Sequence, residues 1–250
     1  MAEYKRSTMI ADSPSGYCPG CLHSLATRLI SDVIDELGQG DNSLNVISVG
    51  CSALNLLYWS GDYLGVAHGR APASATGIKR TNPERLVFTY QGDGDLAAIG
   101  LAEIMSAANR GENFTVIFAN NQTYGMTGGQ MAPTTLIGQK TTTTIYGRDP
   151  ATTGYPMKMC EILSTLEAPA YIARFALNNP KGVRDARAGI KKAFEAQLAG
   201  KGFTFVELLT NCPTNWHMTP LQTLDYMNTN TIPYFKPGVY RDRTSEEAGA

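Results

Sequence analysis

The chain lacks the features that would assign it to nucleic acid, to a membrane or to the secretory pathway. Its 21 lysines and arginines are scattered and balanced by 22 acidic residues, so no basic stripe indicates a nucleic-acid surface. No apolar run approaches the length of a membrane-spanning helix, and residues 1–14 lack the hydrophobic stretch of a secretory signal. We therefore expect no nucleic-acid partner, no membrane partner and a cytoplasmic location.

Internal repeats, low-complexity tracts and a dense set of cysteines are also missing. With 250 residues, 43% of them hydrophobic, and a net charge of -1, the chain is long enough to bury one α/β core. We expect a single domain over residues 1–250. In a reducing compartment, its five cysteines favour free thiols or metal ligands over a disulfide framework.

A βαβ pattern in the first half of the chain organises the rest. An apolar run rich in β-forming residues, 86–90, leads into GDGD at residues 92–95 and a mostly apolar helical segment, and a second strand follows at 114–119. Crossovers of this kind make the two strands parallel. The glycine loop and the Asn-Asn pair at 120–121 should therefore meet at the carboxyl edge of the sheet, where open α/β folds bind ligands.

The glycine loop matches the dinucleotide fingerprint in spacing but not in its other features. Gly92, Gly94 and Ala97 fit G-x-G-x-x-G/A, yet the second strand ends in asparagine, where a nicotinamide site has an acidic residue. No Gly-Lys-Ser/Thr follows, which excludes a P-loop. Asp93 and Asp95 would repel a bare diphosphate, but Mg²⁺ between them reverses the sign because it accepts carboxylate, amide and phosphate oxygens together. The loop therefore predicts a metal-diphosphate site.

The combined motifs resemble a known cofactor site. GDGD followed by NN at this spacing resembles the thiamine diphosphate motif, and NNQTYGMTGGQMAPT resembles its version in the β subunits of 2-oxoacid:ferredoxin oxidoreductases. The resemblance extends from YCPGC to TNCPTNW. It implies an α/β, thiamine diphosphate-binding fold with a mainly parallel sheet covered by helices, plus an N-terminal cluster-binding segment.

The resemblance assigns particular residues to the cofactor and its metal. It implies that Asp93 and Asn121 bind Mg²⁺ through their side chains and Thr123 through its backbone carbonyl. The HGR segment lies by the cofactor in this family, and a His and an Arg ahead of a helix that begins near Pro72 also suit a phosphate. The residues expected to bind the cofactor are His68, Gly69, Arg70, Gly92, Asp93, Gly94, Asp95, Asn121, Thr123, Tyr124, Gly125, Met126 and Thr127.

The cysteines form a second pattern. The CPGC pair at residues 18–21 alone is compatible with a redox dithiol, half a zinc site or half an iron-sulfur site. The polar segment before it does not supply the strand that a dithiol motif needs, whereas Cys51 and Cys212 each follow a predicted strand and can converge. Cys160 lies in mid-helix and is expected in the core. By resemblance, the ligands of a 4Fe-4S cluster are Cys18, Cys21, Cys51 and Cys212.

The resemblance also implies an activity. Thiamine diphosphate, Mg²⁺ and a 4Fe-4S cluster would support oxidative decarboxylation of a 2-oxo acid with coenzyme A, and the electrons would pass to ferredoxin. AHGRAPASATGIKR, YGMTGGQMAPTT and GYPMKMCE favour the branched-chain substrate 2-oxoisovalerate, with 2-oxoglutarate or pyruvate as alternatives. Alternatives of other classes are a thiamine decarboxylase or ligase that does not use ferredoxin, and a zinc-stapled redox or binding module without thiamine chemistry.

A second βαβ cofactor motif is missing, which bears on the glutamate that activates thiamine. In this family a separate pyrimidine-binding domain supplies that glutamate, so the resemblance implies an α subunit as partner, together with γ and ferredoxin-like subunits. Glu103 and Glu161 are not assigned to the role. A salt-bridged or solvated Glu103 is expected within its helix.

Periodicity and turn residues predict the remaining elements. Residues 1–17 are expected to form an irregular arm, 52–65 an aromatic, semi-buried segment, and 124–155 a loop that covers the cofactor or faces another subunit. Residues 216–250 are expected to wrap a neighbour or to fray. Helices are expected over residues 22–37, 71–80, 157–166 and 183–198, and strands over 44–49, 171–177 and 203–209.

Overall fold

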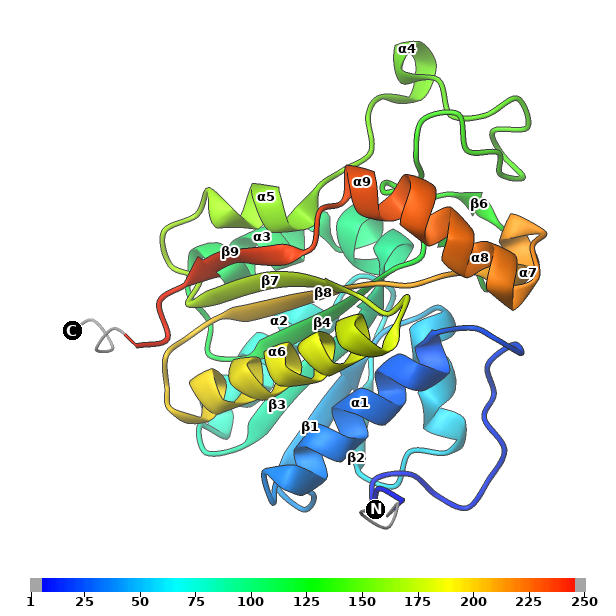
Figure 1. Cartoon of the computed structure of the whole chain (residues 1–250). Coiled ribbons are helices and arrows are strands. Elements are labelled where there is room, and N and C mark those ends of the chain that lie inside the picture. Colours follow the sequence, from blue (N-terminus) through cyan, green and yellow to red (C-terminus); the bar gives the residue numbers. More distant parts are fainter. Residues whose placement is uncertain (1–5, 246–250) are drawn as a thin grey trace.

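Seven of the described strands form the main sheet, in which one edge strand runs antiparallel. A computed structural model describes residues 6–245, and its seven-stranded sheet has the order β2-β1-β3-β4-β8-β7-β9 (Figure 1). Only the β7-β9 pair is antiparallel among the described strands of this sheet. The predicted α/β fold with a mainly parallel sheet is confirmed. The strands are β1 (Ser43–Ile47), β2 (Asp62–Gly65), β3 (Leu86–Gly92), β4 (Thr115–Asn120), β7 (Tyr171–Ala176), β8 (Thr204–Leu209) and β9 (Gly238–Asp242).

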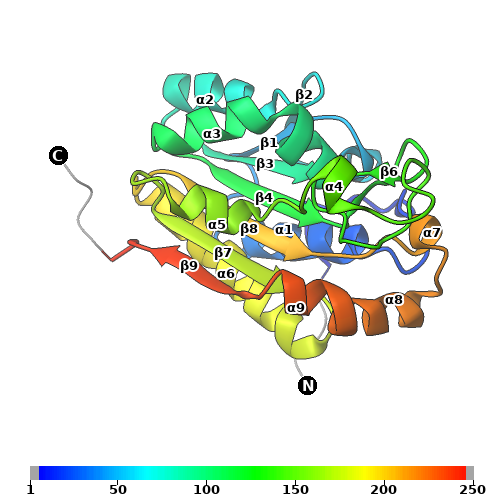
Figure 2. The same cartoon turned by 90° about the horizontal axis from the view of Figure 1, so that it is seen from above.

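Helices cover both faces of the sheet, so the fold has three layers (Figure 2). α1 and α6 pack on one face, and α2, α3 and α5 pack on the other. Among the described residues, no helix combines the length and the hydropathy needed to cross a membrane. The covering helices are α1 (His23–Glu36), α2 (Ala71–Thr81), α3 (Leu101–Asn109), α5 (Met159–Ser164) and α6 (Pro180–Leu198).

Two apolar layers hold the sheet between these helices. Strands β3, β4 and β8 lie in the interior and are buried along nearly their whole length, which explains their mostly apolar sequences. Phe88 of β3 packs on Phe194 of α6 with ring centroids 5.5 Å apart, and Phe114 packs on Phe203 in the opposite layer at 5.6 Å. Burial of each such side chain contributes roughly 1.5–3 kcal/mol.

The parallel order brings several strand ends to one edge. Asp93, Asn121 and Thr210 are the first residues beyond β3, β4 and β8, and these strands are parallel neighbours. Gly92, the last residue of β3, pairs with Ala119 near the end of β4. The expected convergence of the glycine loop and the Asn-Asn pair is therefore confirmed.

The helix after the glycine loop has an irregular first turn. Residues Asp95–Ile99 form a π-helix, η2, and α3 begins after Gly100. A Cβ at Gly100 would lie 2.5 Å from the carbonyl oxygen of Gly69, so the glycine allows two backbones to approach closely. π-Helical turns of this kind often occur at functional sites. Here the turn sets the direction of the Asp95 side chain.

A buried ion network crosses the sheet beneath α5. Arg174 of β7 is fully buried, and its guanidinium lies 2.8 Å from Glu207 of β8 and 2.6 Å from Glu161 of α5. Glu207 in turn accepts a hydrogen bond of 2.8 Å from the side-chain amide of Asn120 at the end of β4. These polar contacts compensate the burial of the charges and join α5, β7, β8 and β4.

The segment after β1 differs from the expectation. The 3₁₀-helix η1 (Cys51–Leu57) is followed by β2, which pairs with β1 and forms one edge of the sheet. All four residues of β2 are exposed, so the expectation of a semi-buried segment is wrong for residues 62–65. The alternation of buried and exposed residues that signals a strand is missing there because both faces of β2 meet solvent.

The end of the chain folds back on its own sheet. Four short helices cover an apolar cluster, and β9 pairs with β7 (Figure 1). The expectation that residues 216–250 wrap a neighbour or fray is therefore wrong for 216–242, because helices of one or two turns leave little periodicity to detect. Residues 1–5 and 246–250 lie outside the described part of the chain. The short helices are α7 (Pro213–Trp216), α8 (Pro220–Tyr226), η3 (Met227–Thr231) and α9 (Ile232–Tyr234).

Residues 132–155 are called the arm: its first residues, 132–136, are largely buried, and the part that carries α4 projects from the body of the fold (Figure 1). The arm follows a short antiparallel pair, β5 (Thr123–Tyr124) and β6 (Gln130–Met131), and contains the single turn α4 (Pro150–Thr153). Arg148 is buried and donates hydrogen bonds of 2.7–3.1 Å to five backbone carbonyls of the arm. This side chain therefore links the two ends of the arm, which is also held by backbone hydrogen bonds such as that from Gly138 to the carbonyl of Arg148 at 2.9 Å.

Candidate cofactor site

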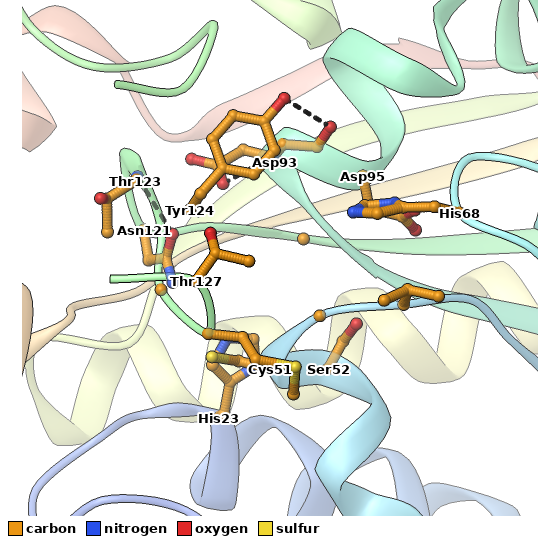
Figure 3. Close-up of a pocket in the computed structure, with 16 residues that line it drawn as sticks. His23, Cys51, Ser52, His68, Asp93, Asp95, Asn121, Thr123, Tyr124 and Thr127 are labelled. Atoms are coloured by element: carbon orange, nitrogen blue, oxygen red, sulfur yellow. Dashed lines mark hydrogen bonds and ion pairs between the residues drawn. The ribbon is translucent and has the colours of Figure 1, made fainter. Parts of the chain in front are cut away.

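One pocket opens at the carboxyl edge of the sheet (Figure 3). Its cavity volume is about 80 Å³, so only part of a small-molecule ligand could be enclosed by this chain alone. Its walls come from His23 of α1, from residues 49–52 after β1, from His68, from 92–95 after β3, and from 121–127 after β4, of which only Gln122 stands back. All of the residues predicted to bind the cofactor line this pocket, except Gly69 and Arg70.

Asp93 is the buried carboxylate of the pocket. Its side chain is 1% exposed, accepts a hydrogen bond of 2.9 Å from the N–H of Gly94, and accepts another from the hydroxyl of Thr134. Burial raises the pKa of this carboxyl to about 7, although the hydrogen bonds act to lower it. Hydrogen bonds alone thus do not offset the cost of burying the charge, whereas a bound divalent cation would.

The turn from Asn121 to Thr123 presents two further oxygen atoms. Gln122 between them has a φ of 62°, a left-handed conformation that non-glycine residues rarely adopt. It is held there by the hydroxyl of Thr135, which donates to its carbonyl at 2.6 Å, and by its own amide, which donates to Thr231 at 2.8 Å. A strained residue fixed from both sides indicates that the geometry of the turn matters.

The side chains on this turn are differently engaged. The hydroxyl of Thr123 donates to the carbonyl of Gln130 at 3.0 Å, so its backbone carbonyl is the oxygen that remains for a metal. The side-chain oxygen of Asn121 accepts only a long contact of 3.3 Å from the N–H of Thr123. Carboxylate, amide and carbonyl oxygens are the ligand types that Mg²⁺ accepts. Asp93, Asn121 and Thr123, which line one pocket, therefore fit a magnesium ion chemically.

Asp95 has a different function from Asp93. One of its oxygens accepts hydrogen bonds from the hydroxyl of Ser48 at 2.8 Å, from the N–H of Gly69 at 2.7 Å and from Nδ1 of His68. The other accepts the side-chain amide of Gln91 at 2.6 Å. Because four donors occupy the carboxylate, Asp95 orients His68 beside the pocket, and Nε2 is the imidazole nitrogen left to meet a ligand (Figure 3).

Gly69 and Arg70, both predicted to bind the cofactor, have partners outside the pocket lining. A Cβ at Gly69, whose φ is +79°, would lie 2.6 Å from the backbone nitrogen of Gly100, so the glycine permits close backbone packing. Arg70 forms an ion pair with Glu103 of α3. The expectation of a paired Glu103 is confirmed.

Tyr124 packs against Gly94 of the glycine loop. Its hydroxyl donates to the carbonyl of Gly94 at 3.1 Å, and a Cβ at Gly94 would lie 2.2 Å from the tyrosine ring. Nothing lies within 4 Å of a Cβ built on Gly92. The two glycines thus differ: Gly94 makes room for Tyr124, and Gly92 leaves open space where a ligand can approach the backbone.

Two of the predicted cluster thiols converge beside the pocket. A Cβ at Gly125 would lie 3.0 Å from the sulfur of Cys51 and 3.7 Å from that of Cys212, so both thiols lie close to one point. Cys18 and Cys21 lie on the loop before α1, where the N–H of Cys21 donates to the carbonyl of Cys18 at 3.0 Å. All are free thiols in the structure.

The four thiols also interact electrostatically. Burial, with smaller contributions from neighbouring cysteines of the set, raises the pKa of Cys21 and of Cys51 to about 12. Burial raises the pKa of Cys212 as well, with Cys18 and Asp93 adding to it. Within residues 6–245, no three His, Cys, Asp or Glu side chains are grouped closely enough to hold a single metal ion. Four coupled thiols are the ligand type of a 4Fe-4S cluster.

The fifth cysteine, Cys160, lies in the core, whereas His23 lies at the pocket. Cys160 is fully buried in α5, as expected for a core residue. His23, two residues after the CPGC pair, was not singled out from the sequence, yet it lines the pocket and its Nδ1 lies 2.5 Å from the hydroxyl of Tyr90. Burial lowers the pKa of His23 to about 4. Its position beside a cysteine motif is the signal that could have identified it.

Other site residues carry weaker signals. Ser48 and Gln91 hold Asp95 from the ends of β1 and β3, where the strand-end rule could have located them. Thr134, which donates to Asp93, belongs to the arm and has no local motif. Asn215 and Trp216 follow Cys212 and contact the pocket loop, but their side chains carry no motif for that contact.

Comparison with protein families and solved structures agrees with this geometry. Residues 48–208 match the family model described as "Thiamine pyrophosphate enzyme, C-terminal TPP binding domain"; thiamine pyrophosphate is thiamine diphosphate. In structure, the chain is similar to 2-oxoglutarate:ferredoxin oxidoreductase from Magnetococcus marinus, solved with 2-oxoglutarate, coenzyme A and succinyl-CoA bound. The TM-score is 0.80 at 26% identity, covering 97% of this chain and 86% of the other.

Curated relatives are also subunits of enzymes named for 2-oxo acids. The chain is 46% identical to ketoisovalerate oxidoreductase subunit VorA of Methanothermobacter marburgensis over 97% of its own length, but it spans only 51% of that protein. It is 35% identical to 2-oxoglutarate synthase subunit KorB of Methanocaldococcus jannaschii, covering 94% of this chain and 83% of the relative. The chain therefore belongs to the thiamine diphosphate-binding subunits of the 2-oxoacid:ferredoxin oxidoreductase family.

Proposed function

We propose that this chain is the β subunit of a 2-oxoacid:ferredoxin oxidoreductase that converts a branched-chain 2-oxo acid and coenzyme A to acyl-CoA and CO₂. Electrons would pass through a 4Fe-4S cluster to ferredoxin. The observation that carries the proposal is the position of Gly125. Its backbone lines the pocket of Asp93 and Asn121 and also lies against the sulfurs of Cys51 and Cys212.

The pocket residues would hold Mg²⁺ and the diphosphate. Asp93, Asn121 and the carbonyl of Thr123 would bind the ion, and the open backbone at Gly92 would lie along the phosphates. His68, fixed by Asp95, would donate or accept at the pocket wall. Thiamine diphosphate, once bound, supplies the decarboxylation chemistry, while these residues bind and orient it.

The cysteines would hold the electron acceptor. Cys18, Cys21, Cys51 and Cys212 are the proposed ligands of the 4Fe-4S cluster, and the contact of Cys51 and Cys212 with the cofactor loop would keep the path for electrons short. The raised pKa values of Cys21, Cys51 and Cys212 mean that these three thiols stay protonated until a metal displaces the protons. Cluster assembly should therefore release protons.

The substrate assignment depends on two observations. A relative named for ketoisovalerate is 46% identical to the chain, whereas a 2-oxoglutarate synthase subunit is 35% identical. Among the described residues that line the pocket, none is a lysine or an arginine that could pair with the second carboxylate of 2-oxoglutarate. Both favour 2-oxoisovalerate over 2-oxoglutarate and leave pyruvate as the control substrate.

The activating glutamate would come from elsewhere. Asp93 and Asp95 are the acidic residues that line the pocket in the described part of the chain, and both are engaged within it. Glu103 pairs with Arg70, and Glu161 pairs with Arg174. We therefore assign the glutamate to a pyrimidine-binding domain on an α subunit, within an assembly that also holds γ and ferredoxin-like subunits.

Anaerobic purification of the chain with its co-encoded partners tests the proposal. We expect thiamine diphosphate, iron and acid-labile sulfide in the complex, and coenzyme A-dependent dye reduction that is fastest with 2-oxoisovalerate, compared with 2-oxoglutarate and pyruvate. Zinc in place of iron, with no retained thiamine diphosphate, would support the zinc-stapled alternative. Retained cofactor without iron would instead support a thiamine enzyme that does not use ferredoxin.

Cysteine variants test the ligand assignment separately. Cys212→Ala should remove the spectroscopic signal of this cluster and leave thiamine diphosphate binding largely intact, because Cys212 does not line the cofactor pocket. Cys160→Ala is the matched control, since it removes a fully buried thiol of α5 that does not line the pocket. A normal cluster in Cys212→Ala would refute the fourth ligand.

A further inference from the structure

A short helix connects the two halves of the site. α7 begins directly after Cys212. Side chains of two of its residues, Asn215 and Trp216, donate hydrogen bonds to the pocket loop and to Cys212. The indole N–H of Trp216 donates to the carbonyl of Asn121 at 3.1 Å, which ties α7 to the proposed magnesium turn. Asn215 makes the other two contacts, and its side chain is not accounted for by any residue role described above.

The side-chain amide of Asn215 bridges the cysteine and the cofactor loop. Its nitrogen donates to the carbonyl oxygen of Gly125 at 2.9 Å and to the sulfur of Cys212 at 3.2 Å. An amide nitrogen carries two hydrogens, so it can serve both acceptors at once. One group therefore touches the proposed cluster ligand and the loop that lines the cofactor pocket.

The surrounding backbone holds Asn215 in place. A Cβ at Gly129, whose φ is +84°, would lie 2.9 Å from the side-chain oxygen of Asn215, so the loop closes around the amide only because this position is glycine. On the other side, Gly125 presents its carbonyl to the amide and its bare Cα to the sulfurs of Cys51 and Cys212. The amide thus has little freedom to turn away from its two partners.

We infer that Asn215 is a positioning residue that tunes the 4Fe-4S cluster through Cys212 and couples the cluster to the cofactor loop through Gly125. The inference rests on the proposed function. An N–H bond to a ligand sulfur stabilises the additional negative charge of the reduced cluster and so raises the reduction potential. The same amide fixes the Gly125 carbonyl, so its removal should be felt at the cofactor as well.

The test uses the complete complex, purified anaerobically. Asn215→Ala removes both side-chain hydrogen bonds and keeps the backbone N–H of residue 215, which also acts on Cys212. Asn215→Asp keeps the side-chain size but replaces the side-chain donor with a negative charge. Thr214→Ala, an exposed neighbour on the same helix, is the matched control. The midpoint potential is measured by EPR-monitored titration of the signal that Cys212→Ala removes, and thiamine diphosphate binding with Mg²⁺ is measured by calorimetry.

We expect the cluster to assemble in both Asn215 variants with a potential below that of the wild type, and lowest in Asn215→Asp. Asn215→Ala should bind thiamine diphosphate about three- to tenfold more weakly, since one hydrogen bond to the loop is lost. Thr214→Ala should match the wild type in both measurements. An unchanged potential in whichever Asn215 variant retains the cluster overturns the inference. A wild-type complex without iron and sulfide refutes the proposed function itself.

Discussion

At the scale of single residues, the site assigns opposite tasks to two nearly adjacent carboxylates. Asp93 faces the pocket and accepts hydrogen bonds from Gly94 and Thr134, with a further contribution from the backbone of Gln122, whereas Ser48, His68, Gly69 and Gln91 donate to Asp95. Asp93 is the first residue after β3, and Asp95 begins η2. Charge alone would have given both the same role. The kind of donor distinguishes them, because three of the donors to Asp95 are side chains that hold both of its oxygens.

Asp93→Asn should therefore remove magnesium-dependent binding of thiamine diphosphate without loss of the fold. The amide keeps the size of the side chain but provides a much weaker ligand, so we expect affinity to fall by more than about 100-fold, as measured by calorimetry. In the absence of cofactor the variant should melt at or above the wild-type temperature, because a buried carboxyl is removed. Asp41→Asn, an exposed substitution, should change neither quantity. Retained affinity would show that Asp93 is not a ligand.

Residue roles were predictable where they follow strand ends and hidden where distant segments supply them. Asp93 and Asn121 sit directly after β3 and β4, so the pattern of strands located them. Thr134 contacts Asp93 across 41 residues of sequence, and Asn215 contacts Gly125 across 90. A hydroxyl or an amide in such a position has no periodicity or motif, and only the fold brings it to its partner.

At the scale of elements, the arm has little regular structure, and one side chain links its two ends. Arg148 is buried among carbonyls that its planar guanidinium can reach simultaneously. The arm also exposes large apolar groups, with Tyr146 92% and Tyr155 70% exposed. A fixed arm that starts beside the cofactor loop matches the expectation of a segment that faces another subunit, and that role stays a prediction.

Arg148→Ala should loosen the arm and leave the sheet intact. Five backbone carbonyls of the arm would lose the hydrogen bonds that Arg148 donates. The arm should then open locally more often, and a loss of ~1.4 kcal/mol in the free energy of opening corresponds to a factor of ten. Limited proteolysis should therefore cleave within residues 132–155 at least tenfold faster. Arg148→Lys should restore little, because an ammonium cannot span the same set of carbonyls. Lys140→Ala, an exposed change in the same arm, is the control. Equal cleavage in all four proteins would show that Arg148 does not hold the arm.

Elements with a long apolar period were predictable, and short or doubly exposed ones were not. α1 and α6 each bury one face against the sheet, which produces the spacing that located them. β2 is exposed along its whole length, and α7 to α9 are too short to repeat a pattern. For these the stabilising contacts are made with strands and helices elsewhere in the chain, and local sequence does not record them.

At the scale of the whole molecule, the cofactor pocket and a group of stabilising ion pairs lie at opposite ends of the parallel strands. The pocket forms at the carboxyl ends of the strands, whereas Glu112 precedes β4 at its amino end and pairs with Arg80 of α2 and with Arg110. Burial acts to raise the pKa of Glu112, but hydrogen bonds from the two arginines outweigh it and leave the pKa lowered. A change at this edge can therefore alter stability without touching the cofactor.

This separation predicts a specific pH dependence. Because the pKa of Glu112 is lower in the folded state, its contribution is complete above the ordinary glutamate value and is lost as the pH falls through the folded value. Glu112→Gln should lower the free energy of unfolding by about 1 kcal/mol at pH 7, since both arginines are largely exposed, and the difference from wild type should vanish in acid. Denaturant unfolding at pH 7 and at pH values below the usual glutamate pKa measures it, with the exposed Glu167→Gln as control. Thiamine diphosphate affinity should be unchanged in Glu112→Gln, and a difference in stability that persists undiminished in acid would contradict an electrostatic origin.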